Sequence, residues 1–185
     1  MDFSKLTEKS AERINRAAAI AAEHSAGAVD ECHLLYSLAE DREGLCPQLV
    51  EYAGADFDKL FADVRSLVAS VPKVTGDARA YMSAALEKTL NAAETVKGEM
   101  KDEFLSVEHL MIALMRSKTE KISKIFNDCG LRADEFLKAL KNVRGNTRVT
   151  NENPEGTYDV LKIYGSDLVE AANSHKLDPV IGRDD

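Results

Sequence analysis

Two stretches of ten residues decide the fold: VDECHLLYSL at residues 29–38 and LSVEHLMIAL at residues 105–114. They lie 76 positions apart, and the same offset aligns residues on both sides of them without a gap. Identical residues at this offset are Asn15/Asn91, Ala17/Ala93, Glu23/Glu99, His33/His109, Leu34/Leu110, Leu38/Leu114, Gly54/Gly130 and Asp58/Asp134. Helical periodicity alone can align apolar positions, but it does not also align helix caps and helix-ending glycines. The sequence therefore indicates an internal duplication.

Each copy is predicted to contain four helices. The first helix of each copy is indicated by an apolar stripe at helical spacing. This stripe comprises Ile14, Ala17, Ala18 and Ala21 in one copy and Met82, Leu86, Leu90 and Ala93 in the other. The fourth helices are expected over about residues 56–69 and 132–143, where apolar positions again recur at helical spacing.

The starts and ends of the helices are marked by the same residue types in both copies. Asp30 and Ser106 precede the second helices, and their side-chain oxygens can accept the free amide protons of a first helical turn. Gly54 and Gly130 follow the third helices, where a left-handed residue ends a helix and glycine takes that conformation without penalty.

The prediction is an all-α fold built from a duplicated four-helix repeat with pseudo-twofold symmetry, eight helices in all. A polar segment with turn residues then indicates a linker, and a ninth helix without a duplicate follows it. The predicted boundaries are 1–143 for the domain (repeats 1–71 and 72–143), 144–157 for a flexible linker, and 158–185 for the further helix and the truncated start of another module.

Composition and charge exclude several classes of protein. The chain has 185 residues, 44% hydrophobic and 30% charged, which is the balance of a globular protein. No apolar run approaches the ~20 residues of a membrane span, and Asp2 stands where a signal peptide would be basic, so we expect a cytoplasmic protein without a membrane partner. The net charge of −8 argues against binding to nucleic acid.

No residue pattern indicates a catalytic or metal site. The three cysteines, Cys32, Cys46 and Cys129, include no CxxC pair, so we expect buried or half-buried free thiols. His33 and His109 occupy equivalent positions in separate copies, so we expect structural roles for them and no shared metal. No GxxxxGK[ST] sequence is present, so this chain is not expected to be an enzyme or to bind a nucleotide cofactor.

The C-terminal fifth of the chain resembles a known family. LDPVIGRDD at residues 177–185 resembles the segment that opens the first nucleotide-binding module of Clp-family AAA+ ATPases. YDVLKIYGSDLVEAANSHK at residues 158–176 resembles the helix before that module, and RVTNENPEGT at residues 148–157 resembles the linker of the ClpB type. The two decisive stretches resemble the xxEHLLxAL motif of the paired N-terminal repeats. Cys32 stands where the motif usually has glutamate, so a role for that acid can fall only to Glu108.

The resemblance implies the N-terminal domain of a ClpB-type disaggregase of the Clp/Hsp100 family, a stress-response chaperone. In that family an ATPase ring threads polypeptides through its pore, and the N-terminal domain recognises unfolded or aggregated protein. The resemblance further implies ATP and Mg, a coiled coil, a hexamer and a DnaK-type chaperone system as collaborator for the full-length protein. Val180 and Ile181 match positions that contact adenine in the full-length ATPase.

The same resemblance implies a client-binding groove near the first helices of the two repeats and the entrance to the second repeat's EHL helix. The candidate substrate-binding residues are Leu90, Leu110 and Met111 as apolar lining, and Thr7, Asp102 and Glu108 as polar positions. Leu90, Leu110 and Met111 fit a helical core stripe equally well. For the three polar residues, capping and plain surface roles are the alternative.

Two other functions remain open at this point. The first is the adaptor- or client-binding domain of a ClpA or ClpC unfoldase that works with a protease, which shares the repeats and the LDPVIGRDD segment. The second is a stand-alone helical scaffold or ligand-binding module, which predicts a natural chain end at Asp185 and an enclosed pocket. Because residues 179–181 resemble the entry to a new structured element, we expect a truncated chain instead.

Overall fold

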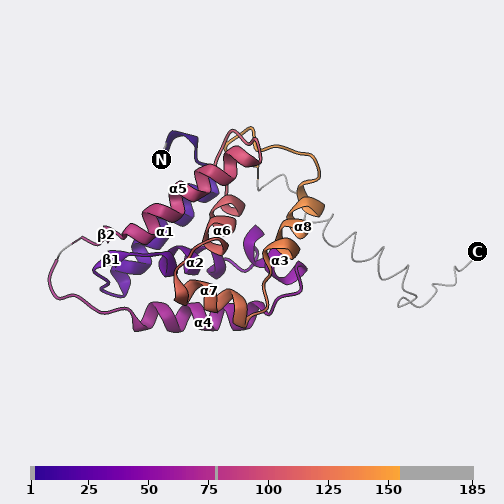
Figure 1. Ribbon diagram of the computed structural model, residues 1–185. Coiled ribbons are helices and arrows are strands. Elements are labelled where there is room, and N and C mark those ends of the chain that lie inside the picture. Colours follow the sequence, from indigo (N-terminus) through magenta and orange to yellow (C-terminus); the bar gives the residue numbers. More distant parts are fainter. Residues whose placement is uncertain (1–2, 78, 155–185) are drawn as a thin grey trace, which may run out of the picture.

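The computed structural model describes residues 3–77 and 79–154, which form a helical body with two very short strands (Figure 1). Repeat one contains η1 (Phe3–Lys5), α1 (Glu8–Glu23), β1 (Ala28–Val29), α2 (Glu31–Glu40), α3 (Leu45–Tyr52) and α4 (Phe57–Ser70). Repeat two contains β2 (Tyr81–Met82), α5 (Ala84–Glu99), α6 (Val107–Met115), α7 (Glu120–Asp128) and α8 (Ala133–Arg144). The prediction of an all-α fold with eight helices in two repeats is confirmed for the described residues.

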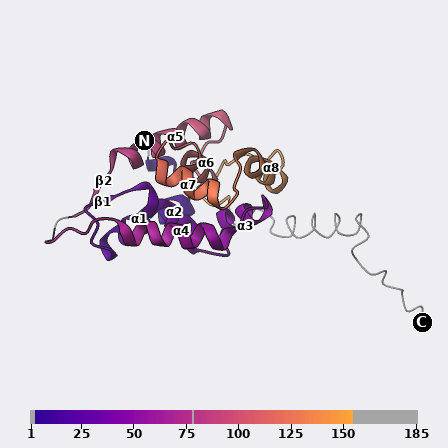
Figure 2. The ribbon, with the colours of Figure 1, turned by 60° about the horizontal axis from the view of Figure 1, so that its bottom comes forward.

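The two repeats interlock with the symmetry that a duplication predicts. In each repeat the first helix packs on the second, α1 on α2 and α5 on α6, and the two second helices meet at the centre (Figures 1 and 2). Contacts between the repeats come in matched pairs: α1 with α6 and α5 with α2, then α3 with α8 and α7 with α4. The repeats therefore share one core instead of folding as separate units.

The helix caps recur 76 positions apart. Thr7 is the N-cap of α1 and accepts the backbone N–H of Ser10 at 3.2 Å, and Ser83 caps α5 by accepting the N–H of Leu86 at 3.0 Å. Asp30 and Ser106 are the N-caps of α2 and α6, as predicted. Since a polar cap satisfies amides that the first turn leaves free, these residues fix where each helix begins.

Left-handed backbone recurs at the same offset. Gly54 and Gly130, with φ of 83° and 78°, end α3 and α7 as predicted. Ser25 and Lys101, with φ of 54° and 57°, follow α1 and α5 and form a second matched pair of turns. Any substitution by a β-branched residue at these four turns would be strained.

Short parallel pairings join the repeats in a matched way. Val29 of β1 pairs with Met82 of β2, and Leu105 makes the corresponding parallel bridge with Leu6. In each pair, the residue just before the first-helix cap of one repeat (Met82 or Leu6) lies beside the residue just before the second-helix cap of the other repeat (Val29 or Leu105). The first helix of each repeat is thus tied to the entrance of the partner repeat's second helix.

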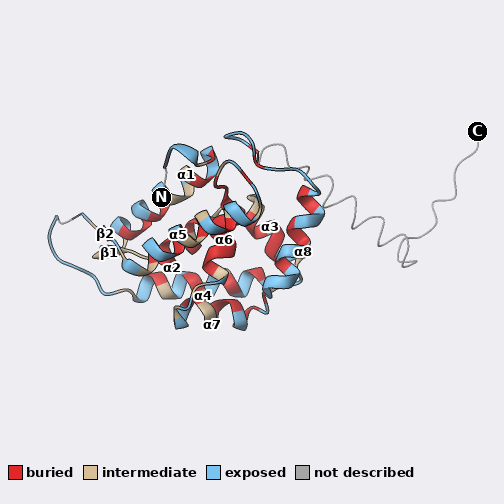
Figure 3. Cartoon of the chain, turned by 45° about the horizontal axis from the view of Figure 1, so that its top comes forward, coloured by how far each residue is buried: buried red, intermediate tan, exposed pale blue. Residues whose placement is uncertain are grey.

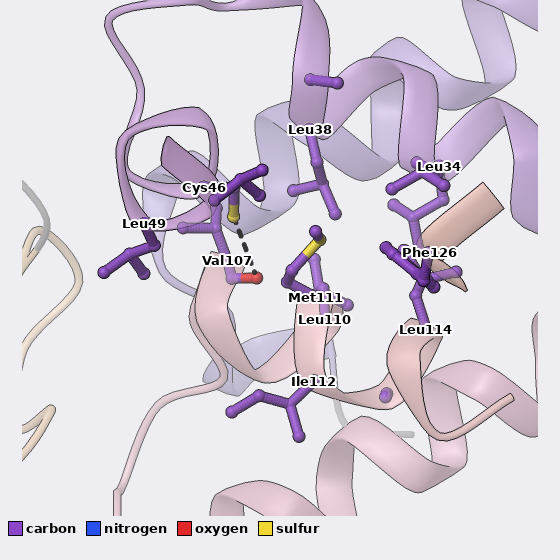
Figure 4. Packing of buried hydrophobic residues seen from close by; sticks show 14 of the residues in the cluster. Leu34, Leu38, Cys46, Leu49, Val107, Leu110, Met111, Ile112, Leu114 and Phe126 are labelled. Atoms are coloured by element: carbon purple, nitrogen blue, oxygen red, sulfur yellow. Dashed lines mark hydrogen bonds between the residues drawn. The ribbon is translucent and has the colours of Figure 1, made fainter. Parts of the chain in front are cut away.

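The core runs through the centre of the body, where α2 and α6 are the most deeply buried helices (Figure 3). Leu110, Met111 and Leu114 of α6 pack toward Leu34 and Leu38 of α2 (Figure 4). The three cysteines are free and buried, as the sequence predicts. One of them, Cys46, lies 3.7 Å from the carbonyl oxygen of Val107 and so contacts the start of α6.

Two details of the first-helix stripes differ from the prediction. Met82 is not in a helix, because Ser83 caps α5 and leaves Met82 before the cap in β2. Ala18 is exposed, because α1 is an outer helix whose buried residues are Ser10, Ala17, Ile20 and Ala21. Both differences place apolar atoms on the surface near the junction of the repeats.

The segment after α8 packs on the body as far as it is described. Val149 is fully buried, and its carbonyl oxygen accepts the N–H of Glu103 at 2.8 Å. The carbonyl oxygen of Glu152 accepts the N–H of Glu8 at 2.7 Å, which ties this segment to the start of α1. Lys73, 76 positions before Val149, makes the corresponding contact as a bridge to Ala26. Residues 144–154, expected to belong to a linker with little to bury, thus contact the body through Val149 and Glu152.

The ninth helix, Val180 and Ile181 lie outside the described residues. Within residues 3–77 and 79–154, no helix has the length and apolar character needed to cross a membrane.

Candidate functional site

The residues predicted to bind substrate are all buried. Leu110 is fully buried and Met111 is 2% exposed, both in the core of α6 (Figure 4). Thr7 is fully buried as the α1 cap, and the side chains of Asp102 and Glu108 are buried among polar groups. Leu110 and Met111 therefore occupy core positions, and Thr7 occupies a capping position. These are the alternative roles that the sequence left open.

Leu90 lies at an apolar groove between α1, α5, β1 and β2. The groove encloses about 180 Å³. Its lining, called here the apolar groove, consists of Ile14, Ala17, Ala18, Val29, Leu34, Ala80, Met82, Leu86 and Leu90. The groove lies between the first helices of the two repeats, where the family resemblance implies a client-binding surface.

Large apolar side chains are exposed beside this groove. Tyr81 is 70% exposed, Val74 43% and Met82 42%. A neighbouring hollow of about 420 Å³ shares Ala18, Val29 and Ala80 with the groove and extends it over Val74. Since soluble proteins seldom gather exposed apolar side chains in one place without a binding role, this surface is the best candidate site.

The sequence predicts only part of the lining of the apolar groove. Ala18 and Met82 have the spacing of helical core residues, so periodicity assigns them to the interior. A serine three positions before Leu86 is the available sign that α5 starts at residue 84 and leaves Met82 outside the helix.

The polar candidates Asp102 and Glu108 belong to a buried ionic cluster with His109 and Arg144. Arg144 Nη2 donates to Asp102 Oδ1 at 2.6 Å, and Arg144 Nη1 lies 3.6 Å from Glu108 Oε1. His109 Nδ1 accepts the N–H of Ser106 at 2.9 Å, so the ring proton lies on Nε2, which is 2.7 Å from Asp102 Oδ2. These charges face one another inside the protein and are not presented to a client.

Asp102 also holds the segment after α8. Its Oδ1 accepts the N–H of Val149 at 2.9 Å in addition to the bond from Arg144. Burial alone would raise the pKa of this carboxyl. The hydrogen bonds from His109, Arg144 and the Val149 amide outweigh burial and lower the pKa to about 2. Asp102 therefore acts as an anchor that stays ionised at neutral pH.

The matching positions of repeat one carry no charge. Asp102, Glu108 and Arg144 correspond at the 76-residue offset to Ala26, Cys32 and Val68, which are all buried. Without an acidic partner, His33 leaves its Nε2 without a hydrogen bond in the described structure, and burial lowers its pKa. Burial likewise raises the pKa of the Cys32 thiol to about 12, so this thiol is unreactive at neutral pH.

A pH dependence follows from the lowered pKa of Asp102. Because the folded pKa of about 2 lies below the ordinary 3.8, the stabilisation is complete above pH 4 and is lost as the pH falls toward 2. We expect this group to contribute at most about 2 kcal/mol to the free energy of unfolding. Urea unfolding of the wild type and Asp102→Asn between pH 6 and pH 2.5 measures it. The difference between the two proteins should shrink below pH 4, and a constant difference would contradict the assignment.

In the part of the chain that the structure describes, no three His, Cys, Asp or Glu side chains are grouped so that they could hold a metal ion.

Comparisons with known proteins agree with this architecture. Residues 5–129 match the family model described as the Clp repeat (R) N-terminal domain. The chain is 37% identical over 189 residues to the chaperone protein ClpB of Clostridium tetani, and 37% identical over 188 residues to that of Bacillus anthracis. Both alignments cover 100% of this chain and 22% of the relative, so the chain spans about a fifth of these proteins.

Solved structures share the fold at low sequence identity. The crystal structure of the Hsp104 N-terminal domain from Candida albicans superimposes with a TM-score of 0.73 at 20% identity, covering 82% of this chain and 99% of that one. A ClpV N-domain in complex with a VipB peptide has a TM-score of 0.60 at 20% identity, covering 75% of this chain and 86% of that one.

Proposed function

Because the chain belongs to the Clp repeat (R) N-terminal domain family, we propose that it is the polypeptide-recognition domain of a ClpB-type disaggregase. In this proposal it engages unfolded or aggregated protein through the apolar groove. The observation that carries the proposal is the exposed apolar surface between α1 and α5, where Ala18 and Met82 are exposed among the lining residues.

The groove suits clients that are recognised by what they expose. Unfolded and aggregated chains differ from native ones by the apolar side chains that they show to water. A groove of about 180 Å³ is too small to enclose a whole ligand and is suited to individual side chains of a passing chain. Met82 has a flexible side chain that adapts to different partners, which favours weak and promiscuous binding.

The kind of partner is supported by a protein of the same fold. A ClpV N-domain is known in complex with a VipB peptide, so a domain of this architecture binds a polypeptide segment. For the present chain the proposed partners are unfolded or aggregated proteins. In the whole protein we propose that ATP and Mg, a hexameric ring and a DnaK-type chaperone system act downstream of this recognition step. This domain itself is proposed to carry no catalysis and no cofactor.

The alternative is the N-domain of a ClpA or ClpC unfoldase, in which the same surface would hold an adaptor. The curated ClpB relatives, aligned over the whole of this chain, favour the disaggregase.

A charge placed in the groove should weaken client binding. Ala18 is exposed and lines the groove, so Ala18→Glu would bring a carboxylate against each apolar side chain that enters. An unpaired charge beside a buried apolar group costs about 1–3 kcal/mol, so we expect the affinity for the unfolded protein to fall about tenfold or more. Titration of the labelled 185-residue chain with a permanently unfolded protein, followed by NMR, measures this change.

The neighbouring residue provides the control. Ala19 is also exposed on α1 but is not one of the groove-lining residues, so Ala19→Glu adds the same charge outside the groove. We expect Ala19→Glu to change the affinity less than twofold. If the two variants bind the unfolded protein equally well, the groove is not the site.

A further inference from the structure

A second pocket, lined by both polar and apolar side chains, lies beside another face of α5. It encloses about 580 Å³ between α5 and the turn that joins α6 to α7. Its lining, called here the Glu31 pocket, consists of Glu31, Ala85, Lys88, Thr89, Ala92, Ala113, Arg116, Ser117, Lys118 and Thr119. None of these residues belongs to the apolar groove.

Glu31 is a buried carboxylate with one unused oxygen. It is 2% exposed at the first turn of α2. Its Oε1 accepts hydrogen bonds from Thr89 Oγ1 at 2.5 Å and from Ser117 Oγ at 2.6 Å. Its Oε2 is buried and has no hydrogen-bond partner in the described part of the chain. Buried acceptors without a donor are uncommon and costly, so this oxygen indicates a missing cationic or polar partner.

The duplication shows what fills the corresponding space in the other repeat. Thr89 and Ala92 of the pocket correspond to Arg13 and Arg16 of α1, 76 positions earlier. Arg13 Nη1 donates to the carbonyl oxygen of Ser37 at 2.9 Å, and Arg16 Nε donates to Glu40 at 2.6 Å. The Glu31 pocket is therefore the space that two arginine side chains occupy in repeat one and that shorter side chains leave open in repeat two.

The rim of the Glu31 pocket is basic. Lys88, Arg116 and Lys118 stand where repeat one has Glu12, Glu40 and Arg42. Arg116 donates to Glu99 at 2.9 Å, whereas the two lysines have no salt bridge among the described residues. A lone cation would be repelled at this rim, but a cation accompanied by acidic groups would be attracted.

We propose that the Glu31 pocket binds a lysine or arginine side chain of a polypeptide, within a segment where acidic residues flank that basic residue. The basic group donates to Glu31 Oε2, in the space that Arg13 fills in repeat one. The flanking acidic groups lie at the rim beside Lys88 and Lys118. This contact does not involve the apolar groove. It selects polypeptides by their pattern of charges, in addition to the selection by exposed apolar side chains at the groove.

The geometry defines the contact at Oε2. The two hydroxyl donors already use Oε1, so a guanidinium cannot take both oxygens as a bidentate fork. Oε2 is buried in the unbound chain, so a single N–H of an ammonium or guanidinium group reaches it only after the side chains that cover it move aside.

Short capped peptides test the proposal directly. The probe is an acetylated, amidated, fluorescently labelled peptide with Glu-Lys-Glu at its centre, together with versions that carry arginine or norleucine in place of lysine. Binding to the 185-residue chain is measured by fluorescence anisotropy and by NMR shifts of the Thr89 and Ser117 amides. We expect the lysine or arginine peptide to bind at least about tenfold more tightly than the norleucine peptide, since a hydrogen bond to a charged group is lost. Equal binding of all three peptides would overturn the proposal.

Two variants of the chain locate the contact. Glu31→Gln keeps the shape and the acceptor for Thr89 and Ser117 but removes the charge, and we expect binding about tenfold weaker. Thr89→Arg should fill the pocket as Arg13 does in repeat one, so we expect peptide binding to be lost while the melting temperature does not fall. Glu87→Gln is the matched control, because Glu87 is exposed on α5 and does not line the pocket.

The outcomes separate this site from the apolar groove. If Glu31→Gln and Thr89→Arg both bind the peptide like the wild type, the proposal is wrong whatever happens at the groove. Ala18→Glu should leave binding of the Glu-Lys-Glu peptide unchanged within about twofold. If Ala18→Glu abolishes it, the peptide is held in the groove and the Glu31 pocket is not its site.

Discussion

Replacing Leu110 by alanine is expected to lower the free energy of unfolding by about 3–5 kcal/mol. Leu110 is fully buried at the centre of the body, where α6 packs against α2 (Figure 4). The change removes apolar atoms and leaves a cavity in the core that both repeats share, so relaxation can recover only part of the loss. Urea denaturation followed by circular dichroism measures the effect.

The same experiment distinguishes the two roles that the sequence allowed for Leu110. Leu137 of α8 is 40% exposed, so Leu137→Ala makes the same chemical change at the surface and should cost less than about 1 kcal/mol. Under conditions where Leu110→Ala remains folded, its affinity for an unfolded client should match that of the wild type. A large loss of client affinity with little loss of stability would instead make Leu110 a binding residue.

Asp102→Ala is expected to be nearly as destabilising, at about 3–5 kcal/mol. The variant removes the carboxylate that accepts from Arg144 Nη2 and from the N–H of Val149, and it leaves Arg144 with Glu108 at 3.6 Å and the carbonyl oxygen of Thr147 at 3.1 Å. Removing one partner of a buried ion pair costs more than replacing the whole pair by apolar groups, because a buried charge remains with weaker pairing. Chemical denaturation at pH 7 checks the value, and Asp134→Ala, at an exposed position of α8, is the control.

The residues of repeat one indicate how to restore the stability that Asp102→Ala loses. The triple variant Asp102→Ala, Glu108→Cys and Arg144→Val installs the residues that repeat one carries at the same positions, Ala26, Cys32 and Val68. We expect it to recover at least half of the stability that Asp102→Ala loses, since no buried charge is left unpaired. A triple variant less stable than the single variant would show that the cluster stabilises the fold by more than charge pairing.

Much of the fold could be predicted because the informative residues act locally. Asp30, Ser106, Gly54 and Gly130 end or begin helices through their own backbone and side-chain chemistry, and the structure places each of them as predicted. The repetition of these signals at one offset then indicates the symmetry of the whole body. The burial of the cysteines follows from their size and apolar character.

Only the general location of the candidate site could be predicted from the sequence. Helical spacing shows that Leu90, Leu110 and Met111 lie on apolar faces, but not which of those faces another element covers. That depends on the distant pairing of α2 with α6, which buries Leu110 and Met111 and leaves Leu90 at a groove. The ionic cluster was missed for a similar reason, since Asp102 and Arg144 are 42 residues apart and meet only in the folded chain.

The attachment of residues 149–152 has a mechanical consequence. A pull applied to the chain beyond Pro154 first meets the hydrogen bond between Glu152 and Glu8, and then the bonds that Val149 makes with Glu103 and Asp102. Only after these break does tension reach Arg144 at the end of α8. Traction from the C-terminal side would thus be resisted first at the start of α1 in repeat one and then at the ionic cluster of repeat two, before it reaches α8.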